Sequence, residues 1–203
     1  MKHIDLLMER YPSLEVCRAD IVDAAQTIID MHKKGGALLI CGNGGSSADA
    51  EHISGELLKG FLKKRPLSDS ESASLPDAIA QGLQGGIRAI PLTSLTALGT
   101  AFSNDVDAEL VYAQLVWALG DGNSVFLGIS TSGNAKNVSS AALVAKAKGL
   151  KTIGLTGVGG GKLAEICDTC IKAPECETYK IQELHLPIYH AICAQVEEEF
   201  FTE

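Results

Sequence analysis

ALLICGNGGSSADAEHISGELL, residues 37–58, joins an apolar run to a helix-like pattern through a turn rich in glycine and serine. The apolar run predicts a strand over 37–42, and the spacing of apolar residues after the turn predicts a helix over 47–62. Glycine lets the backbone approach an anion closely, and a helix N-terminus attracts negative charge. The hydroxyls of Ser46 and Ser47 add donors or cap the helix. The stretch therefore predicts either a phosphate-binding turn or an ordinary capped turn, and the rest of the chain must decide between them.

The alternation of apolar strand and helix continues to the end of the chain. Strand-like runs are expected at 37–42, 88–93, 124–130, 151–156 and 168–173, with helices at 47–62, 108–119, 135–148, 161–166 and 178–200. Apolar strands alternating with helices are typical of an α/β fold, with a parallel sheet covered on both faces. In such sheets ligands bind beyond the carboxyl ends of the strands.

An amphipathic helix is expected before the first strand, over residues 13–34, so that residues 1–36 form an N-terminal helical segment. Its apolar residues recur at helical spacing, and Gly35 and Gly36 supply a stop. Such a helix packs either on its own domain or on a partner subunit, and we expect the partner.

Residues 63–87 break the pattern with serines, acidic residues, prolines and a terminal pair of glycines. The segment is expected to be a surface insertion, either a lid over the neighbouring turns or a passive excursion, and we favour the passive one. The length of 203 residues fits one compact domain, residues 1–203, better than two.

A second hydroxyl-rich turn, Ser130-Thr131-Ser132, follows the expected strand at 124–130 and leads into a helix. Three hydroxyls and successive backbone amides in one small volume match the several acceptor oxygens of a phosphate. Two such turns in one sheet favour phosphate-group binding over two coincidental caps.

The composition excludes several classes of protein. A net charge of −8 with dispersed basic residues argues against nucleic-acid binding. The sequence contains no apolar run long enough to span a bilayer and no secretory signal pattern, so a cytoplasmic protein without membrane contact is expected. The six cysteines are scattered, which suits reduced thiols. Cys167-x-x-Cys170 lies in a strand-like stretch without a second such pair, so a metal or redox role for it is disfavoured.

Five motifs, in this order along the chain, carry a resemblance to a known family: CGNGGSSADAEH (41–52), SNDVDAELV (103–111), GISTSGNAKNV (128–138), TIGLTGVGGGKLA (152–164) and YKIQELHLPIYH (179–190). As a set, covering residues 37 to 198, they resemble the sugar isomerase (SIS) domain family, in particular its phosphoheptose isomerase branch. The resemblance implies a three-layer sandwich with a five-stranded parallel sheet and a homotetramer with active sites between subunits. It also implies the conversion of sedoheptulose 7-phosphate to D-glycero-D-manno-heptose 7-phosphate, usually with zinc.

The resemblance also implies roles for individual residues. Glu56 and His190 would be the catalytic pair, and the metal ligands would be His52, Glu56, Gln182 and His190. The residues that would bind the substrate are Asn43, Gly44, Gly45, Ser46, Glu56, Asn104, Asp105, Ser130, Thr131, Ser132 and Gln182.

Residue spacing supports only part of this metal site. His52 and Glu56 lie four apart on the expected helix, so both side chains project from one face and could share a metal ion, although such a pair is also common on ordinary surfaces. Gln182 and His190 are separated by a helical rise of about 12 Å. Either a kink at Pro187 brings these two together, or they serve the sites of different subunits.

The proposed chemistry fits these residue types. An aldose–ketose isomerase moves a proton between adjacent carbons and stabilises an enediolate. Glu56 fits the base, His190 fits the acid because histidine changes charge nearest to neutral pH, and Asp105 would bind sugar hydroxyls or assist ring opening.

Several positions depart from the family pattern: Ala135 and Ser94 replace a serine and an acidic residue, Tyr179 stands where aspartate is common, and residues 63–87 are long. A different phosphosugar is therefore one alternative substrate. The other alternative is a non-catalytic regulator that binds a phosphosugar or a protein, as in a replication-initiation regulator that resembles this branch. Such proteins lose the catalytic carboxylate and histidine, whereas this chain has Glu56 and His190.

Overall fold

The fold is built on a five-stranded parallel sheet with the strand order β2-β1-β3-β4-β5. A computed structural model of the chain describes residues 1–201. The strands are β1 (Leu38–Gly42), β2 (Ala89–Pro91), β3 (Val125–Ile129), β4 (Lys151–Gly157) and β5 (Thr169–Ala173). The register aligns Leu38 with Ala89 on one side and with Val125 on the other. The five expected strands are confirmed, with ends that shift by one or two residues.

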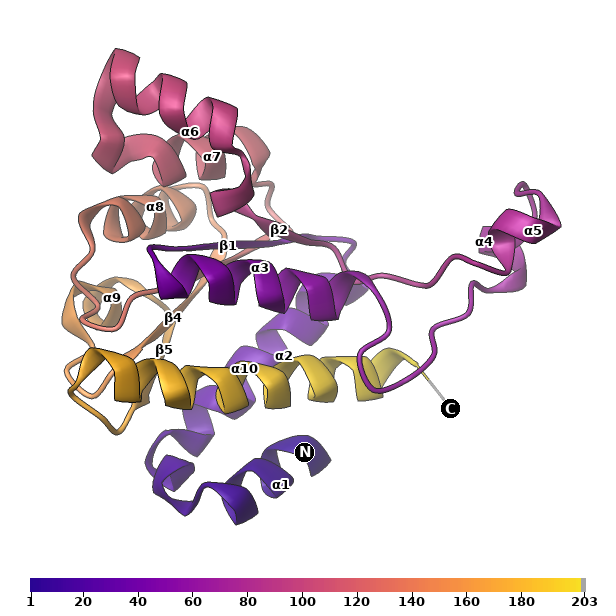
Figure 1. The fold of residues 1–203 in the computed structure, drawn as a ribbon, viewed down its shortest axis with the longest axis horizontal. Coiled ribbons are helices and arrows are strands. Elements are labelled where there is room, and N and C mark those ends of the chain that lie inside the picture. The colour runs from indigo at the N-terminus through magenta and orange to yellow at the C-terminus, as the bar shows by residue number, and fades with distance from the viewer. Residues whose placement is uncertain (202–203) are drawn as a thin grey trace.

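Alternate side chains of the strands enter two separate cores. Leu38 and Ile40 belong to the core beneath α1 (Lys2–Arg10), α2 (Arg18–Lys33), α3 (Gly45–Leu58) and α10 (Thr178–Phe200). Leu39 and Cys41 belong to the core beneath α7 (Val111–Leu119), α8 (Lys136–Ala147) and α9 (Gly161–Ile166). Because the side-chain period of a strand is two, a strand buried on both faces must be apolar throughout, as β1 is. Helices therefore cover both faces, and the α/β three-layer fold is confirmed (Figure 1).

The N-terminal segment differs from the expected single helix. α1 ends at Arg10, a 3₁₀ turn covers Pro12–Cys17, and α2 begins at Arg18. Pro12 explains the break, because proline restricts the residue before it and lacks an N–H. α2 buries its apolar face, including Ile21 and Ile28, in the core of its own domain. The expectation that this helix packs on a partner was therefore wrong for its apolar face.

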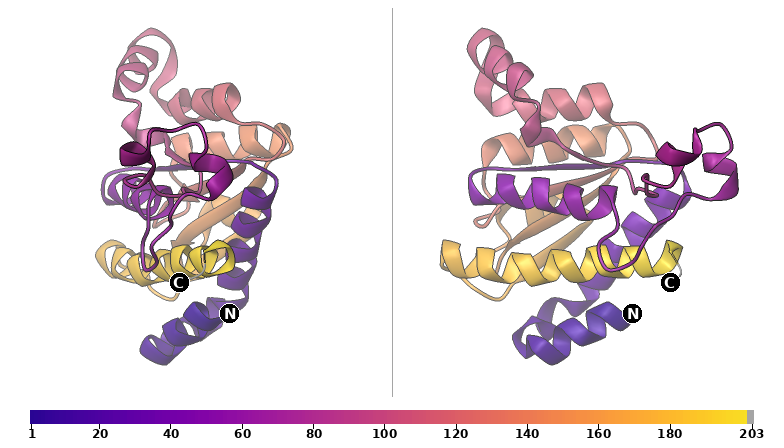
Figure 2. Two further views of the ribbon diagram at one scale, coloured as in Figure 1. Left: turned by 90° about the vertical axis from the view of Figure 1, so that its right-hand side faces the viewer. Right: turned by 45° about the vertical axis from the view of Figure 1, so that its right-hand side comes forward.

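The segment between α3 and β2 carries two short helices, α4 (Asp69–Ser72) and α5 (Asp77–Ala80). An antiparallel bridge between Pro66 and Gln84 brings together the stretches of chain that lead into and out of these helices. It projects away from the body of the molecule (Figure 2). Arg65 and Ile87, near its two ends, are buried. Whether residues 63–87 form an insertion, and whether residues 1–203 form a single domain, stay predictions.

The segment between β2 and α7 was not expected to be helical over most of its length. It forms a 3₁₀ turn (Leu92–Ser94), α6 (Thr96–Phe102), a π-helical turn (Ser103–Asp107) and a 3₁₀ turn (Ala108–Leu110). Its short apolar stretches lack the sustained period that identifies a long helix. Within the part of the chain that the structure describes, each helix is too short or too polar to cross a membrane.

Candidate active site

β1 lies between β2 and β3, so the chain adds β2 on one side of β1 and then crosses to add β3 on the other side. In open α/β sheets a crevice forms at such a switch point, beyond the carboxyl ends of the strands. The glycine-rich turn after β1 and the hydroxyl-rich turn after β3 both stand there. The sheet topology thus brings together the two turns that the sequence singled out.

The glycine-rich turn depends on the absence of side chains at two positions. Gly44 has φ +57°, a left-handed conformation that L side chains rarely adopt, and nothing else crowds it. Gly45 opens α3, and a Cβ there would lie 2.7 Å from Nε2 of Gln182. The turn therefore admits Gln182, which arrives from α10. Ser46, the next residue, is buried.

A pair of asparagines joins the glycine-rich turn to the start of α8, the helix that follows the hydroxyl-rich turn. Asn43 and Asn137 exchange hydrogen bonds between their side-chain amides, each 2.9 Å from nitrogen to oxygen. Tyr112 donates its hydroxyl to the carbonyl of Gly42 over 2.8 Å. Burial, with Cys41 nearby, raises the pKa of Tyr112 to about 12, so the hydroxyl keeps its proton. Asn137 and Tyr112 were missed in the sequence, although Asn137 stands in the motif GISTSGNAKNV (128–138).

The hydroxyl-rich turn presents its residues at different depths. Ser130 is buried, Thr131 is half-buried, and Ser132 is exposed. The Oγ atom of Ser132 accepts the N–H of Asn134 over 3.2 Å, and Gly133, with φ +68°, closes the turn. The residues predicted to bind phosphate after β3 therefore lie at the end of the strand next to β1, which leads into the glycine-rich turn.

A cavity of about 710 Å³ lies between the turn that follows β2 (Leu92–Ser94), α6, α7 and the start of α8. Asn104, Tyr112 and Asn137 contribute polar atoms to its lining, together with Thr93. Asn104 and Asp105 stand on the π-helical turn, where the Asn104 amide donates to Oδ1 of Asp105 over 2.8 Å. Asn104 therefore reaches the cavity near the glycine-rich turn, whereas Asp105 is not among the residues that line it.

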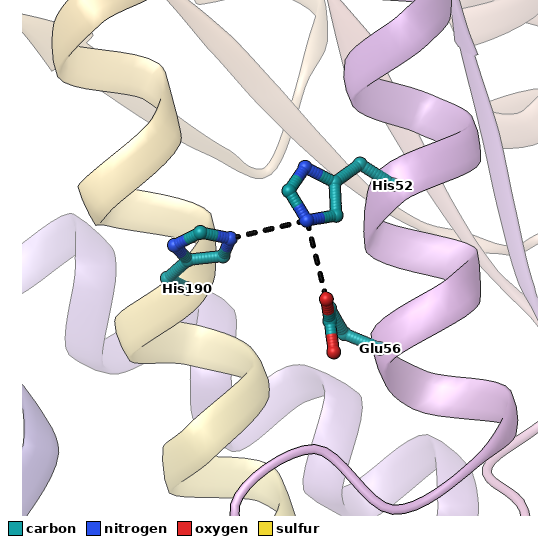
Figure 3. Close-up of side chains that lie close together, drawn as sticks. All are labelled: His52, Glu56 and His190. Carbon is teal, nitrogen blue, oxygen red and sulfur yellow. Dashed lines mark hydrogen bonds and ion pairs between the residues drawn. The ribbon is translucent and has the colours of Figure 1, made fainter.

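A separate cluster of side chains forms where α3 and α10 lie side by side (Figure 3). Nε2 of His52 is 3.2 Å from Oε1 of Glu56 and 3.3 Å from Nε2 of His190. His52 and Glu56 share a face of α3 through their spacing of four residues, and His190 comes from α10. The structure therefore brings together three of the four predicted metal ligands.

The cluster has the dimensions of a metal site. The three ligand atoms lie within 4.8 Å of one another. Two ligands bound at about 2.1 Å to a tetrahedral zinc ion are about 3.4 Å apart, close to the two separations above. Nitrogen and carboxylate ligands suit zinc, and three protein ligands leave a fourth position for a substrate or water. The residues therefore fit a zinc ion, and its identity stays a prediction.

The helix that carries Gln182 and His190 does not end or restart at Pro187. α10 runs as one helix from Thr178 to Phe200, with Pro187 inside it. Gln182 lies against Gly45, and His190, two turns further along, lies against His52, seven residues after Gly45. α3 and α10 thus advance in the same direction, and Gln182 is held at the glycine-rich turn. Its predicted roles as metal and substrate ligand stay predictions.

The charge state of His190 is influenced by its surroundings. Burial lowers its pKa, and the neighbouring His52 and Arg10 lower it further, while Glu56 opposes them. His190 also lines a cavity of about 470 Å³ between α1 and α10, so one side of the cluster is open. A neutral imidazole is the form that binds a metal ion.

Tyr189 and Asp49 lie behind His52 and were missed as functional residues. The Tyr189 hydroxyl is 3.0 Å from Nδ1 of His52 and donates to Oδ1 of Asp49 over 3.2 Å. Burial raises the pKa of Asp49, opposed by the Tyr189 hydrogen bond and by His52. A signal was available, since Asp49 precedes His52 by one helical turn and Tyr189 precedes His190 directly.

The comparisons with known proteins agree on one family. A model of the SIS domain matches residues 7–157. Phosphoheptose isomerase 2 of Campylobacter jejuni is 43% identical over 181 residues, which cover 89% of this chain and 81% of that protein. The phosphoheptose isomerase of Aneurinibacillus thermoaerophilus is 40% identical over 181 residues, 89% of this chain and 82% of that protein. The solved structure of phosphoheptose isomerase from Neisseria gonorrhoeae superposes with a TM-score of 0.77 at 30% identity, covering 97% of this chain and 96% of that one.

Proposed function

The chain belongs to the SIS domain family. From this premise we propose that the two turns bind the substrate of a phosphoheptose isomerase and that the cluster of His52, Glu56 and His190 carries out the reaction. The enzyme is a sugar-phosphate aldose–ketose isomerase, which converts sedoheptulose 7-phosphate to D-glycero-D-manno-heptose 7-phosphate. The observation that carries the assignment of residues is the cluster of His52, Glu56 and His190 beside the glycine-rich turn.

The two turns bind the phosphate and the neighbouring hydroxyls of the sugar. Ser130, Thr131, Ser132 and the N-terminus of α3 supply hydroxyl and backbone donors without a formal positive charge. His52 lies seven residues beyond Gly45, a rise of about 10 Å along α3. An extended sugar with its phosphate at one end and its carbonyl at the other suits this separation. The remaining proposed substrate ligands are Asn43, Gly44, Gly45, Ser46, Asn104, Asp105 and Gln182.

Glu56 moves the proton between the two reacting carbons. Its Oε1 faces His52, whereas Oε2 is 3.7 Å from the exposed Lys59 ammonium. We assign the base to Oε2, which takes the proton from one carbon and returns it to the next through an enediolate. His190 gives a proton from Nε2, the atom that faces the cluster, to the carbonyl oxygen of the sugar. It takes a proton back from the neighbouring hydroxyl, which becomes the new carbonyl.

Zinc is the metal that we propose for the cluster, held by His52, Glu56 and His190. When bound, the ion supplies a positive charge that stabilises negative charge developing on oxygen. Nε2 of His190 cannot hold a cation and donate a proton at the same time. A zinc-dependent reaction would therefore leave His190 as a ligand, and a zinc-independent one would leave it as the acid.

We also propose a homotetramer in the cytoplasm, with active sites between subunits. Support for assembly comes from the apolar residues exposed along α6, α7 and the turns between them, which are Leu95, Leu98, Val106, Leu110, Trp117 and Leu119. A second copy of the chain covering them would remove apolar surface from water. The six free cysteines suit a reducing compartment. Light scattering of the purified protein tests the subunit count.

The experiment that tests the function measures isomerisation of sedoheptulose 7-phosphate by the purified protein, after chelation and after zinc is added back. The Glu56→Gln variant should lose about 10²–10⁴ in kcat, the usual contribution of a general base. Glu51→Gln is the matched control, since Glu51 is an exposed carboxylate on the same helix. Wild-type turnover with loss in Glu56→Gln alone supports the assignment.

An absence of turnover would contradict this function. If the protein still bound the sugar phosphate, the binding without catalysis would favour the regulatory alternative. Turnover of a different phosphosugar with the same dependence on Glu56 would retain the mechanism and change the substrate.

A further inference from the structure

The Tyr189 side chain bridges the proposed metal cluster and a carboxylate that lies outside it. Tyr189 is 2% exposed, and its ring meets His52 and His190 edge-on, with centroid separations of 5.5 Å and 5.0 Å. Packing alone would be met equally well by phenylalanine. The hydroxyl adds two polar contacts, to Nδ1 of His52 and to Oδ1 of Asp49.

A tyrosine hydroxyl has one proton to donate, so its two contacts cannot be of the same kind. A carboxylate only accepts hydrogen bonds, and the proton of Tyr189 therefore goes to Asp49. Oδ2 of Asp49 is buried without a partner among residues 1–201, so a proton on that oxygen would find no acceptor. The contact with His52 is left for the imidazole to donate, from Nδ1–H to the tyrosine oxygen.

We propose that Tyr189 and Asp49 are positioning residues that keep a proton on Nδ1 of His52, so that Nε2 presents its lone pair to the cluster. The inference rests on the proposed metal site. The ring nitrogens of a histidine are distinct, and the hydrogen bond made by one decides what the other can bind. Nε2 of His52 is the atom nearest to both Glu56 and His190, so its lone pair is the one a metal ion would need.

The arrangement also fixes the direction of the His52 ring. His52 is exposed along one side, and its side chain would otherwise rotate freely. Tyr189 is buried on α10, and Asp49 is one turn before His52 on α3. The three residues thus tie the exposed imidazole to two packed helices. Positioning groups of this kind change metal affinity by about 10–100-fold when they are removed.

The test measures zinc dissociation constants by competition with a chelator for wild type, Tyr189→Phe and Tyr179→Phe. Tyr179 lies on the same helix and is 58% exposed, so its variant is the matched control. We expect Tyr189→Phe to weaken zinc binding about 10–100-fold and the control to leave it unchanged. Thermal unfolding of each variant checks that the fold is retained. Unchanged zinc affinity in Tyr189→Phe would overturn the proposal.

A second readout does not require metal. Nitrogen NMR of the histidine rings should show a proton on Nδ1 of His52 in both the metal-free and the zinc-loaded protein, whether or not Nε2 also donates to Glu56 when the ion is absent. In Tyr189→Phe the proton on Nδ1 should exchange rapidly. A proton found on Nε2 instead would overturn the positioning role. If wild type failed to bind zinc while Nδ1 still carried the proton, the metal assignment would fail, and the positioning of His52 by Tyr189 and Asp49 would stand.

Asp49→Asn tests whether the carboxylate acts through the tyrosine. The substitution should weaken zinc binding in the wild-type background and add nothing in the Tyr189→Phe background, because residues acting through one contact are not additive. Equal losses of zinc affinity in both backgrounds would show that Asp49 acts on the metal directly. That result would contradict the proposal that Asp49 acts through Tyr189.

Discussion

Arg65 and Glu197 form an ion pair in which neither side chain is more than 1% exposed, with Nε of Arg65 2.8 Å from Oε1 of Glu197. Arg65 also donates to the carbonyls of Leu57 and Glu56, at the end of α3, over 2.6 Å and 3.0 Å. Burial raises the pKa of Glu197, but the N–H groups of Phe61 and Leu62 and the guanidinium outweigh it, so the pKa is lowered. The pair therefore secures the end of the helix that carries Glu56.

Removing one partner of this pair should destabilise the protein strongly. Arg65→Met leaves the buried Glu197 carboxylate with backbone N–H donors but without a cation beside it. We expect a loss of about 3–5 kcal/mol in the free energy of unfolding. Arg18→Met is the matched control, because Arg18 pairs with Asp5 at the surface and should contribute less than about 1 kcal/mol. Urea denaturation of both variants measures the difference. Equal losses would show that the buried pair has no special role.

Gly45→Ala should displace the amide of Gln182. A Cβ at this position would lie 2.7 Å from Nε2, and the flexible glutamine can rotate away. We expect Gly45→Ala and Gln182→Ala to impair turnover to a similar extent, and the double variant to be no worse than either, since both remove the same contact. Steady-state kinetics of the three variants test this. Additive losses would show that Gly45 and Gln182 act independently.

Gly55→Ala should stabilise the protein. Gly55 lies within α3, and a Cβ there meets no other atom within 4 Å. Alanine in a helix interior is favoured over glycine by about 0.5–1 kcal/mol. The thermal midpoint should therefore rise while the kinetic constants stay unchanged. A lower midpoint would mean that the space beside Gly55 is filled in the assembled protein.

His185 should make the protein less stable in mild acid. Burial lowers its pKa to about 4, against the opposing hydrogen bond between Nε2 and the carbonyl of Thr156. Between about pH 6.5 and pH 4 the unfolded state binds the proton and the folded state does not, so stability is lost as the pH falls. The full effect is about 3 kcal/mol.

His185→Gln isolates this contribution, because glutamine is of similar length and does not titrate. The stability of wild type should fall more steeply than that of the variant between pH 6.5 and pH 4.5, as measured by urea denaturation. Parallel profiles would assign the acid sensitivity to other groups.

The sequence predicted the features that depend on neighbouring residues. Apolar runs identified the strands, and the four-residue spacing paired His52 with Glu56, because strand and helix periods act locally. Residue spacing could not predict that His190 meets His52, since 138 residues separate them and only the packing of α10 on α3 joins them. The family resemblance alone implied that the two share a site. For the same reason it left open whether Gln182 and His190 converge.

The sequence also missed residues whose role depends on a partner. Tyr189 resembles any core aromatic until its hydroxyl is seen between His52 and Asp49. α6 and the π-helical turn were missed because their short stretches do not show a sustained helical period.

The parallel course of α3 and α10 sets a rule for which changes of sequence the enzyme can tolerate. Gly45 faces Gln182, His52 faces His190, and Arg65 links the end of α3 to Glu197, so the two helices are matched at three successive levels. One residue inserted into either helix turns everything beyond it by about 100° and advances it by about 1.5 Å. Point substitutions between these levels leave the match intact. A single insertion or deletion in α3 or α10 would instead dismantle the phosphate turn, the metal cluster or the buried ion pair, so length in these helices is under stricter constraint than composition.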